Sequence, residues 1–415
     1  MGRPVPNRAG VPFGGMAVDE LQDEAQDLLT EAVGLRRDLH RHPEVGNDLP
    51  MTRERILEEL DDLGLDVTLH ESTSGIAALL TGGKPGPTIL LRADMDALPM
   101  PEQTGLDFAS EVDGAMHACG HDTHVAMLSG AARLLVARRQ DLPGRILFMF
   151  QPGEEGFHGA RHMIDEGLLD RTGPAGRPEA AYALHISATV PSGELHVRPG
   201  PLMAAADIVR VTVSGRGGHA SAPHDALDPV PAAAAMVGAL QTAITRRVDT
   251  HQPVVLTIAH ITAGTTNNVI PETAFMEGTL RTLSETTRTQ MHEEIRRVCR
   301  YTALAHSCAA GVEIVPGYPV TINDDAATAR VAALSGALLG PERVISMPNP
   351  IMGAEDFSYV LAEVPGALAF LGGCPPEVDP LGAPPNHSNR VIFDEDALAN
   401  GVAVYAALAL DALRR

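Results

Sequence analysis

The sequence predicts an α/β protein of two domains, and three observations support this prediction. The chain has 415 residues, which is more than a single hydrophobic core usually holds. Short apolar runs alternate with helical patterns in the first part of the chain and again towards the C-terminus, as in an α/β sheet with parallel strands. Between these parts the pattern changes to strand, helix, strand, strand, helix, strand, as in a ferredoxin-like fold. We therefore expect a discontinuous main domain with a smaller domain inserted.

The main domain begins with two predicted helices. Leucines and alanines recur at helical spacing over residues 18–42, and a second helical pattern covers about 51–64 and ends at Gly64. Short apolar runs that follow predict strands, and a helical pattern at about 121–138 lies between the second and third of them. The runs are "IAALL" (76–80), "TILLRADMDAL" (88–98), "RILFMF" (145–150) and "AAYALHI" (180–186).

The inserted domain is predicted to cover residues 201–314, so that the main domain comprises 18–200 and 315–415. Its first strand, in "DIVRVTVSGRGGHA", alternates with period two. Helices are expected at about 228–247 and 284–302. The remaining strands are expected in "PVVLTIAHITAG", "ETAFMEGTLRTL" and "GVEIVPGYP". Residues 1–17 are rich in glycine and proline and have no apolar core, so we expect a flexible tail rather than a signal peptide.

Composition excludes several classes of partner. The formal charge is −22, from 31 basic and 53 acidic residues, and such a surface repels the phosphates of nucleic acids. No apolar stretch approaches the ~18 residues that span a membrane. The four cysteines are scattered and form no CxxC pair, which favours the reducing cytoplasm over a disulfide framework.

Potential metal ligands stand where the predicted strands end. Asp94 and Asp96 end one strand, Glu154 and Glu155 follow the next, and His185 ends a third. Open α/β sheets bind ligands outside the carboxyl ends of their strands. We therefore expect these side chains to meet in one crevice.

The segment "HACGHDTHVAML" (117–128) is expected to supply further ligands from the loop before a helix. Cys119 alone is more typical of a small buried apolar residue. With His121 two positions away and acids on neighbouring strands, a metal site becomes the better interpretation. Thiolate and imidazole suit zinc, and manganese, cobalt or nickel also fit when carboxylates share the site.

Three other polar residues of this segment have open roles. His117 and His124 either support the ligands from behind or are polar residues at the start of the helix. Asp122 either caps that helix or takes a direct part in the site.

The segment "QPGEEG" (151–156) predicts a division of labour between two glutamates. Adjacent residues in an extended chain point to opposite sides. One carboxylate can then bind a metal while its neighbour takes a proton from the attacking water, as metal-assisted hydrolysis requires. The alternative, a solvated acidic loop, is less consistent with the apolar strand that leads into the pair.

Taken together, the motifs resemble peptidase family M20, and within it the amidohydrolase branch of hippurate hydrolases, N-acyl-amino-acid amidohydrolases and auxin-conjugate hydrolases. The resemblance implies a zinc-peptidase-like catalytic domain with helices flanking a central sheet, and an inserted lid domain that also dimerises. The matching motifs are "LRRDLHRHPEVG" (35–46), "LRADMDALPM" (91–100), "HACGHDTHVAML", "FQPGEEG" (150–156), "ALHI" (183–186), "VSGRGGHASAPH" (213–224), "TTNNVIP" (265–271), "GTLRT" (278–282), "MGAEDFSY" (352–359) and "NHSNR" (386–390).

The resemblance implies roles for individual residues in the main domain. Glu154 is the general base and later the proton donor to the leaving amine, and Asp96 orients a ligand from behind. The family's usual "HxD" is "DMD" here, which leaves the role of Asp94 open. Two divalent ions, Mn, Zn, Co or Ni, are expected to be held by Cys119, His121, Glu155, His185 and His387.

The inserted domain contributes further residues according to the same resemblance. His219 stabilises the oxyanion, often from a partner subunit, while Asn268 and Arg281 grip the substrate carboxylate. From the residues alone, His219 is more typical of a turn and Arg281 of a solvated strand face. For Glu355, capping of a helix near Phe357 with support of the metal site is favoured over direct ligation.

Two departures from the family pattern stand near the site. "QPGEE" replaces "QPAEE", which we expect only to loosen the backbone. The segment after "HPEVG" reads "NDLPMT" in place of a more acidic form, which we expect to alter the first loop and no ligand.

The predicted function is a metal-dependent amidohydrolase that cleaves the amide bond of a small-molecule N-acyl amino acid. The alternative is a dipeptidase or carboxypeptidase that acts on short peptides with the same two-metal site. A non-catalytic metal-binding or scaffold protein is disfavoured, because none of the catalytic residues is missing. A homodimer or homotetramer is the family expectation; a nucleic-acid or membrane partner is not expected.

Overall fold

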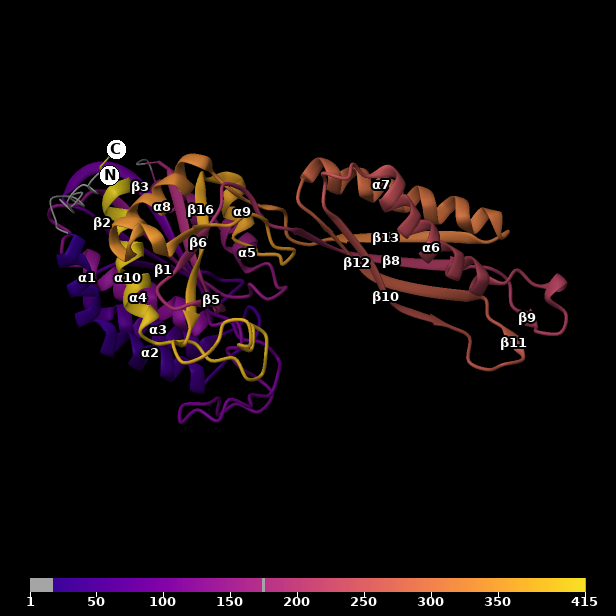
Figure 1. Cartoon of the computed structure of the whole chain (residues 1–415), viewed down its shortest axis with the longest axis horizontal. Coiled ribbons are helices and arrows are strands. Elements are labelled where there is room, and N and C mark those ends of the chain that lie inside the picture. Colours follow the sequence, from indigo (N-terminus) through magenta and orange to yellow (C-terminus); the bar gives the residue numbers. More distant parts are fainter. Residues whose placement is uncertain (1–17, 174–175, 415) are drawn as a thin grey trace, which may run out of the picture. The chain divides into compact units, whose positions relative to one another are not determined.

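The computed structural model describes residues 18–173 and 176–414, which form two compact units (Figure 1). The first unit contains the described residues up to Gly200 together with 322–348 and 359–414, and the second contains 201–321 and 349–358. The tail expected at residues 1–17 lies outside the described part of the chain.

The first unit is built on an eight-stranded sheet of order β1-β2-β4-β3-β5-β16-β6-β15. Its strands are β1 (Asp66–Leu69), β2 (Ile76–Thr81), β3 (Lys84–Asp94), β4 (Pro143–Gln151), β5 (Ala180–Pro191), β6 (Leu195–Val197), β15 (Val344–Ser346) and β16 (Gly366–Cys374). The α/β class is confirmed. The central strands β4, β3, β5 and β16 run parallel to one another, and β6 and β15 form a second parallel pair that is antiparallel to β16. β1 and β2 extend the sheet as antiparallel strands, β1 paired with β2 and β2 with β4.

The helices of the first unit largely follow the sequence pattern. They are α1 (Val18–Asp27), α2 (Leu29–Arg41), α3 (Pro50–Leu60), α4 (His121–Val136), α5 (Gly159–Asp165), α8 (Asp325–Leu339), most of α9 (Ser358–Glu363) and α10 (Ala397–Ala412). The single helix expected over 18–42 is in fact two, which are separated at Leu28. The second expected helix ends at Leu60, and a short 3₁₀ turn follows before Gly64, whose φ of 57° reverses the chain.

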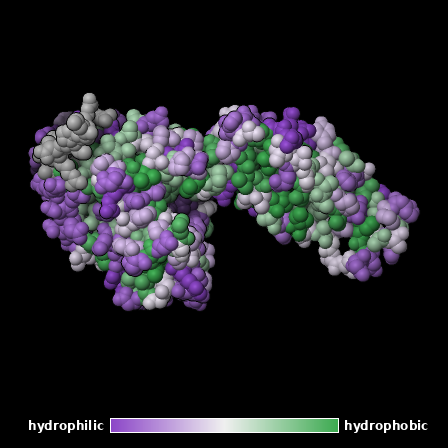
Figure 2. Space-filling model, viewed as in Figure 1, coloured by the Kyte–Doolittle hydropathy of each residue, from purple (hydrophilic) through white to green (hydrophobic). Residues whose placement is uncertain are grey.

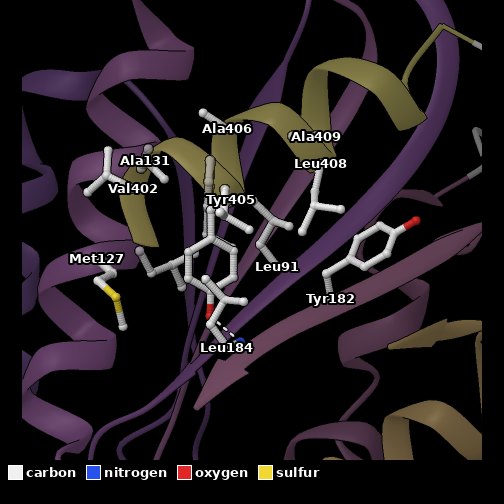
Figure 3. Close-up of a cluster of buried hydrophobic side chains, with 14 of the residues drawn as sticks. Leu91, Met127, Ala131, Tyr182, Leu184, Val402, Tyr405, Ala406, Leu408 and Ala409 are labelled. Atoms are coloured by element: carbon white, nitrogen blue, oxygen red, sulfur yellow. Dashed lines mark hydrogen bonds between the residues drawn. The ribbon is translucent and has the colours of Figure 1, made fainter. Parts of the chain in front are cut away.

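The C-terminal helix α10 packs against the sheet and holds its central strands together. Nearly all of its side chains are buried, and Figure 3 shows Tyr405 pointing from this helix towards Leu184. The Tyr405 hydroxyl donates to the carbonyl of Arg92 at 2.6 Å and accepts from the N–H of Leu184 at 2.9 Å. One phenol thus joins β3 to β5 directly before His185.

Replacing Tyr405 with phenylalanine should lower the free energy of unfolding by about 1–3 kcal/mol, because it leaves the buried N–H of Leu184 without a partner. Urea unfolding followed by circular dichroism measures the change. Tyr301→Phe is the control, since this tyrosine is 58% exposed. Equal midpoints for the two variants would contradict the assigned role of the hydroxyl.

The second unit has a four-stranded antiparallel sheet of order β10-β12-β8-β13. In chain order its elements are β8 (Ala205–Ser214), α6 (Pro229–Arg247), β10 (Val254–Ala263), β12 (Thr273–Thr282), α7 (Glu285–Ala305) and β13 (Ala309–Pro316). Both helices cover the same face of the sheet (Figure 1). This is the predicted ferredoxin-like order, and β8 alternates between buried and more exposed residues as its period-two pattern predicts.

Two short strand pairs complete the second unit and its junction. β9 (Gly218–His219) pairs with β11 (Val269–Ile270), and β7 (Gly200–Met203) pairs with β14 (Thr321–Asn323). The visible surface of each unit mixes hydrophilic and hydrophobic residues (Figure 2). Within the described residues, no helix has the length and apolar character needed to cross a bilayer.

Candidate metal centre and active site

The predicted ligands of the first unit come together at the carboxyl ends of the central strands. Asp94 is the last residue of β3, Glu154 and Glu155 follow β4, and His185 lies on β5. The ligands form three overlapping groups, and within each group the ligand atoms lie within 4.8 Å of one another. They are Cys119, His121 and His185; Cys119, Glu155 and His387; and His121, Glu154 and Glu155.

Cys119 is the centre of this cluster. Its Sγ lies 3.5 Å from Nε2 of His185 and 3.2 Å from Nε2 of His387. Burial opposes ionisation of the thiol, but the imidazoles of His185 and His121 outweigh it and lower the pKa of Cys119 to about 5. The side chain is therefore a thiolate at neutral pH, which is the form that binds metals.

Two buried polar atoms in the cluster lack hydrogen-bond partners within the described part of the chain and are suited to bind a cation. Nε2 of His121 and Oε1 of Glu155 make no hydrogen bond with the described residues. Oε1 of Glu155 lies 3.1 Å from Nε2 of His387, and buried polar atoms normally have partners. Sulfur, imidazole nitrogen and carboxylate oxygen aimed at a common space are a ligand set for Zn, Mn, Co or Ni.

His387 reaches this cluster through an unusual backbone conformation. Its φ of 68° lies in the left-handed region, which residues other than glycine seldom adopt and which often marks functional sites. The sulfur of Cys119 and the carboxylate of Glu155, which lie beside its ring, raise the pKa of His387 to about 10.

Asp96 fixes the loop that carries both glutamates. Its Oδ1 accepts from the N–H of Glu154 and its Oδ2 from the N–H of Glu155, each at 3.0 Å. Its carbonyl lies 2.8 Å from Nδ1 of His121, which leaves Nε2 of that ring for a ligand. Asp96 thus has the contacts of an orienting residue, and its role in catalysis stays a prediction.

The capping interpretation of Asp122 is wrong. The cap position of α4 is Gly120, and no side chain caps this end of the helix. The buried carboxylate of Asp122 instead accepts from Nε of Arg36 at 2.8 Å and pairs with Nδ1 of His40 at 2.8 Å. Burial opposes its charge, but these cations hold the pKa of Asp122 far below its usual range.

The sequence pattern did not predict this buried network of ion pairs. Arg36 also reaches Glu395, and His40 lies 3.3 Å from Glu102. A polar pair four residues apart on the apolar face of α2 was the available signal. The network holds α2 against the helix that begins at His121.

His117 and His124 differ in their surroundings. Both nitrogens of His117 are buried without a hydrogen bond in the described part of the chain, and burial lowers its pKa to about 3. His124 is hydrogen-bonded on both sides, to Asp94 and to the N–H of Ile186.

Gly153 does more than loosen the backbone, so this expectation was wrong. Its φ is +65°, and a Cβ there would lie 1.9 Å from Oδ1 of Asn47. Asn47 belongs to the unusual "NDLPMT" segment, and its Nδ2 donates to the carbonyl of Phe157 at 2.9 Å. The two departures from the family pattern thus meet in space, directly beside the loop of Glu154.

Replacing Gly153 with alanine should reduce hydrolytic activity by about 10- to 100-fold, since displacing a catalytic group by ~1 Å has effects of this size. Gly156→Ala is the matched control: its φ is +90°, but nothing lies within 4 Å of its Cβ position. Adding Asn47→Ala to Gly153→Ala should recover part of the loss. Steady-state kinetics measures all four proteins, and equal losses in the two single glycine variants would rule out the contact with Asn47 as the cause.

The predicted residues of the second unit lie in two places. His219 pairs with Val269 across β9 and β11, and the N–H of Ala220 donates to the carbonyl of Asn268. Arg281 lies near the other end of the sheet, opposite Ala206. Eight residue steps along β12 separate Thr273 from Arg281, which is roughly 26 Å at ~3.3 Å per residue.

Glu355 also belongs to the second unit. Its Oε1 accepts from the N–H of Phe357 at 2.8 Å, directly before α9. This contact agrees with the capping interpretation.

Known proteins resemble this chain in sequence and in structure. The model of peptidase family M20/M25/M40 matches residues 90–411. The chain belongs to peptidase family M20. It is 36% identical to thermostable carboxypeptidase 1 of Saccharolobus solfataricus, over 95% of this chain and 98% of that protein. It is also 36% identical to an N-acetylcysteine deacetylase of Bacillus subtilis, over 92% and 96%.

A solved M20 structure supports the same assignment. The Bacillus subtilis YXEP protein, described as a dinuclear metal-binding peptidase of this family, has a TM-score of 0.81 and 32% identity. The similarity covers 94% of this chain and 99% of that one. The M20 fold therefore extends over both units.

Proposed function

We propose that this M20 protein is a metal-dependent amidohydrolase that cleaves the amide bond of N-acyl amino acids. The observation that carries the proposal is the cluster of Cys119, His121, Glu155, His185 and His387, of which only His387 is exposed, with Glu154 held beside it by Asp96. The named relatives are consistent with it. A carboxypeptidase and a deacetylase of an N-acetyl amino acid both cleave an amide on the amino group of a carboxylate-bearing residue.

The five ligand residues would hold two divalent ions, and the related YXEP protein is a dinuclear metal-binding peptidase. Such ions polarise the substrate carbonyl and lower the pKa of water. The ligand set suits Mn, Zn, Co or Ni, and metal availability usually decides among them.

Glu154 is the proposed general base. Its side chain is only 6% exposed, and Asp96 holds its backbone. It takes the proton of the attacking water and later delivers it to the leaving amine, so that the same carboxylate serves both half-steps.

Arg281 is the proposed partner of the substrate carboxylate. It is half-buried, and burial lowers its pKa. Asp207, whose charge acts on Arg281, is already paired with Arg288 and His292, and no hydrogen bond to the guanidinium of Arg281 occurs within the described residues. A half-buried guanidinium that has no carboxylate partner in the protein can donate hydrogen bonds to the carboxylate of a ligand.

His219 and Asn268 are proposed to act on the site of a partner subunit. His219 and Asn268 lie beyond the Thr273 end of β12, whereas Arg281 lies roughly 26 Å along that strand from Thr273. All three residues are therefore not expected to grip one small substrate from a single copy of the domain. The N–H of Ser221 donates to Nδ1 of His219 at 3.1 Å. The neutral ring therefore carries its proton on Nε2, ready to donate to an oxyanion.

A homodimer or homotetramer through the inserted domain follows from this division. The edge strand β10 supports it, because its second half is exposed and includes Ile261 at 50%. Unpaired edge strands are common places of association. We also propose a cytoplasmic location, since all four cysteines are free and buried.

The alternative function is a dipeptidase or carboxypeptidase that uses the same metal site and general base to cleave short peptides. The test is a panel of hippurate, N-acetyl amino acids, an indole-acetyl amino acid and dipeptides, with metal-stripped protein reconstituted with each candidate ion. Cleavage of acyl amides supports the proposal. Cleavage of dipeptides alone assigns the dipeptidase function, and hydrolysis of neither class under full metal loading contradicts both.

A further inference from the structure

Asp94 is the first aspartate of "DMD", the segment that replaces the family's usual "HxD", and its surroundings allow two interpretations. It is completely buried, and its Oδ2 lies 3.3 Å from Nε2 of His121. With His121 and His124 it forms a group that could hold an ion. Asp94 is therefore either a further ligand or a fixed anion that holds the ligands in place.

Arg92 favours the second interpretation. Its Nη1 donates to Oδ2 of Asp94 at 2.8 Å, and its Nε donates to Oε1 of Gln151 at 2.8 Å. The guanidinium is buried without access to solvent. The oxygen that faces His121 is thus already neutralised by a permanent cation, which would repel a divalent ion at the same atom.

His124 is occupied on both sides of its ring. The N–H of Ile186 donates to Nε2 at 2.7 Å, so this nitrogen is an acceptor. The proton of the neutral ring must then be on Nδ1, which donates to Oδ1 of Asp94 at 2.5 Å. No lone pair remains on His124 for an ion.

We infer that Arg92, Asp94 and His124 form a positioning chain that holds the metal ligands and does not itself bind metal. The chain runs from the end of β3 to Ile186 of β5, directly beside His185, and Asp94 borders His121. Outer hydrogen bonds of this kind set the orientation of metal-binding imidazoles. The inference rests on the proposed metal centre and assigns the "DMD" motif a role that a histidine ligand does not have.

Calorimetric titration of metal-stripped protein with Mn²⁺ separates the two interpretations. In Asp94→Asn and His124→Gln, we expect both ions still to bind at saturation, with dissociation constants raised about 10- to 100-fold. Glu155→Ala is the ligand control and should lose an ion outright. His70→Gln, a buried histidine paired with Glu166, is the structural control and should leave Mn²⁺ affinity unchanged.

His124→Gln keeps the pair of Arg92 and Asp94, so it decides the matter if Asp94→Asn fails to fold. Loss of one ion at saturation in either variant would show a ligand and overturn the inference. Affinities within twofold of the unaltered protein in both variants would overturn it as well. If the unaltered protein does not bind two ions, the proposed metal centre fails instead, which is a distinct result.

Discussion

Glu154→Gln should lower the rate of hydrolysis by about 10²- to 10⁴-fold, the usual contribution of a general base, while metal binding is retained. Glutamine keeps the size of the side chain but cannot take a proton from water. The backbone contact with Asp96 does not depend on the side chain at this position. The measurement is kcat on the best acyl amide, with metal content determined on the same samples.

Glu155→Gln is the matched control for Glu154. It changes the neighbouring carboxylate in the same way, but Glu155 lies against Cys119 and His387, so this variant should lose metal as well as activity. Retention of activity in Glu154→Gln, or loss of metal from it, would show that the roles of the two glutamates were assigned in reverse or wrongly.

Mixing two inactive variants should restore activity. Glu154→Gln carries an intact His219, and His219→Ala carries an intact Glu154. If His219 acts on the partner's site, each mixed dimer contains one complete site, and equal random mixing yields about a quarter of the original activity, as expected for a twofold-symmetric pair. The measurement is kcat after subunit exchange, compared with each variant alone.

A second mixture controls this experiment. His219 and Asn268 lie together at one end of the inserted domain, so His219→Ala mixed with Asn268→Ala leaves every site without one of the two residues. No recovery is expected there. Recovery in both mixtures, or in neither, would contradict the action of His219 across subunits.

Much of the candidate site was predictable because the ends of the strands can be located in the sequence. Asp94, Glu154, Glu155 and His185 each follow an apolar run, and strands of one sheet place such residues at a common edge. Cys119 was expected from its own segment, whereas His387 was expected only from the resemblance to family M20. The period-two strands and long helices of the inserted domain were predictable for the same reason, since burial patterns repeat along the chain.

Contacts between distant side chains were not predictable. Asp122 looks like a helix cap, and only the fold brings Arg36, 86 positions away, against its carboxylate. Gly153 and Asn47 appear as unrelated departures until the structure places one against the other. The break at Leu28 and the antiparallel edge of the sheet likewise depend on tertiary packing, which local propensity does not encode.

The most direct test of the metal-dependent mechanism is hydrolysis of an N-acetyl amino acid as Mn²⁺ is added stepwise to metal-stripped protein. Bound metal is measured at each step. Activity should be absent without metal, rise with loading and stop rising when two ions per chain are bound. Full activity in the stripped protein, or none when two ions are bound and all acyl amides of the panel have been tried, would contradict it.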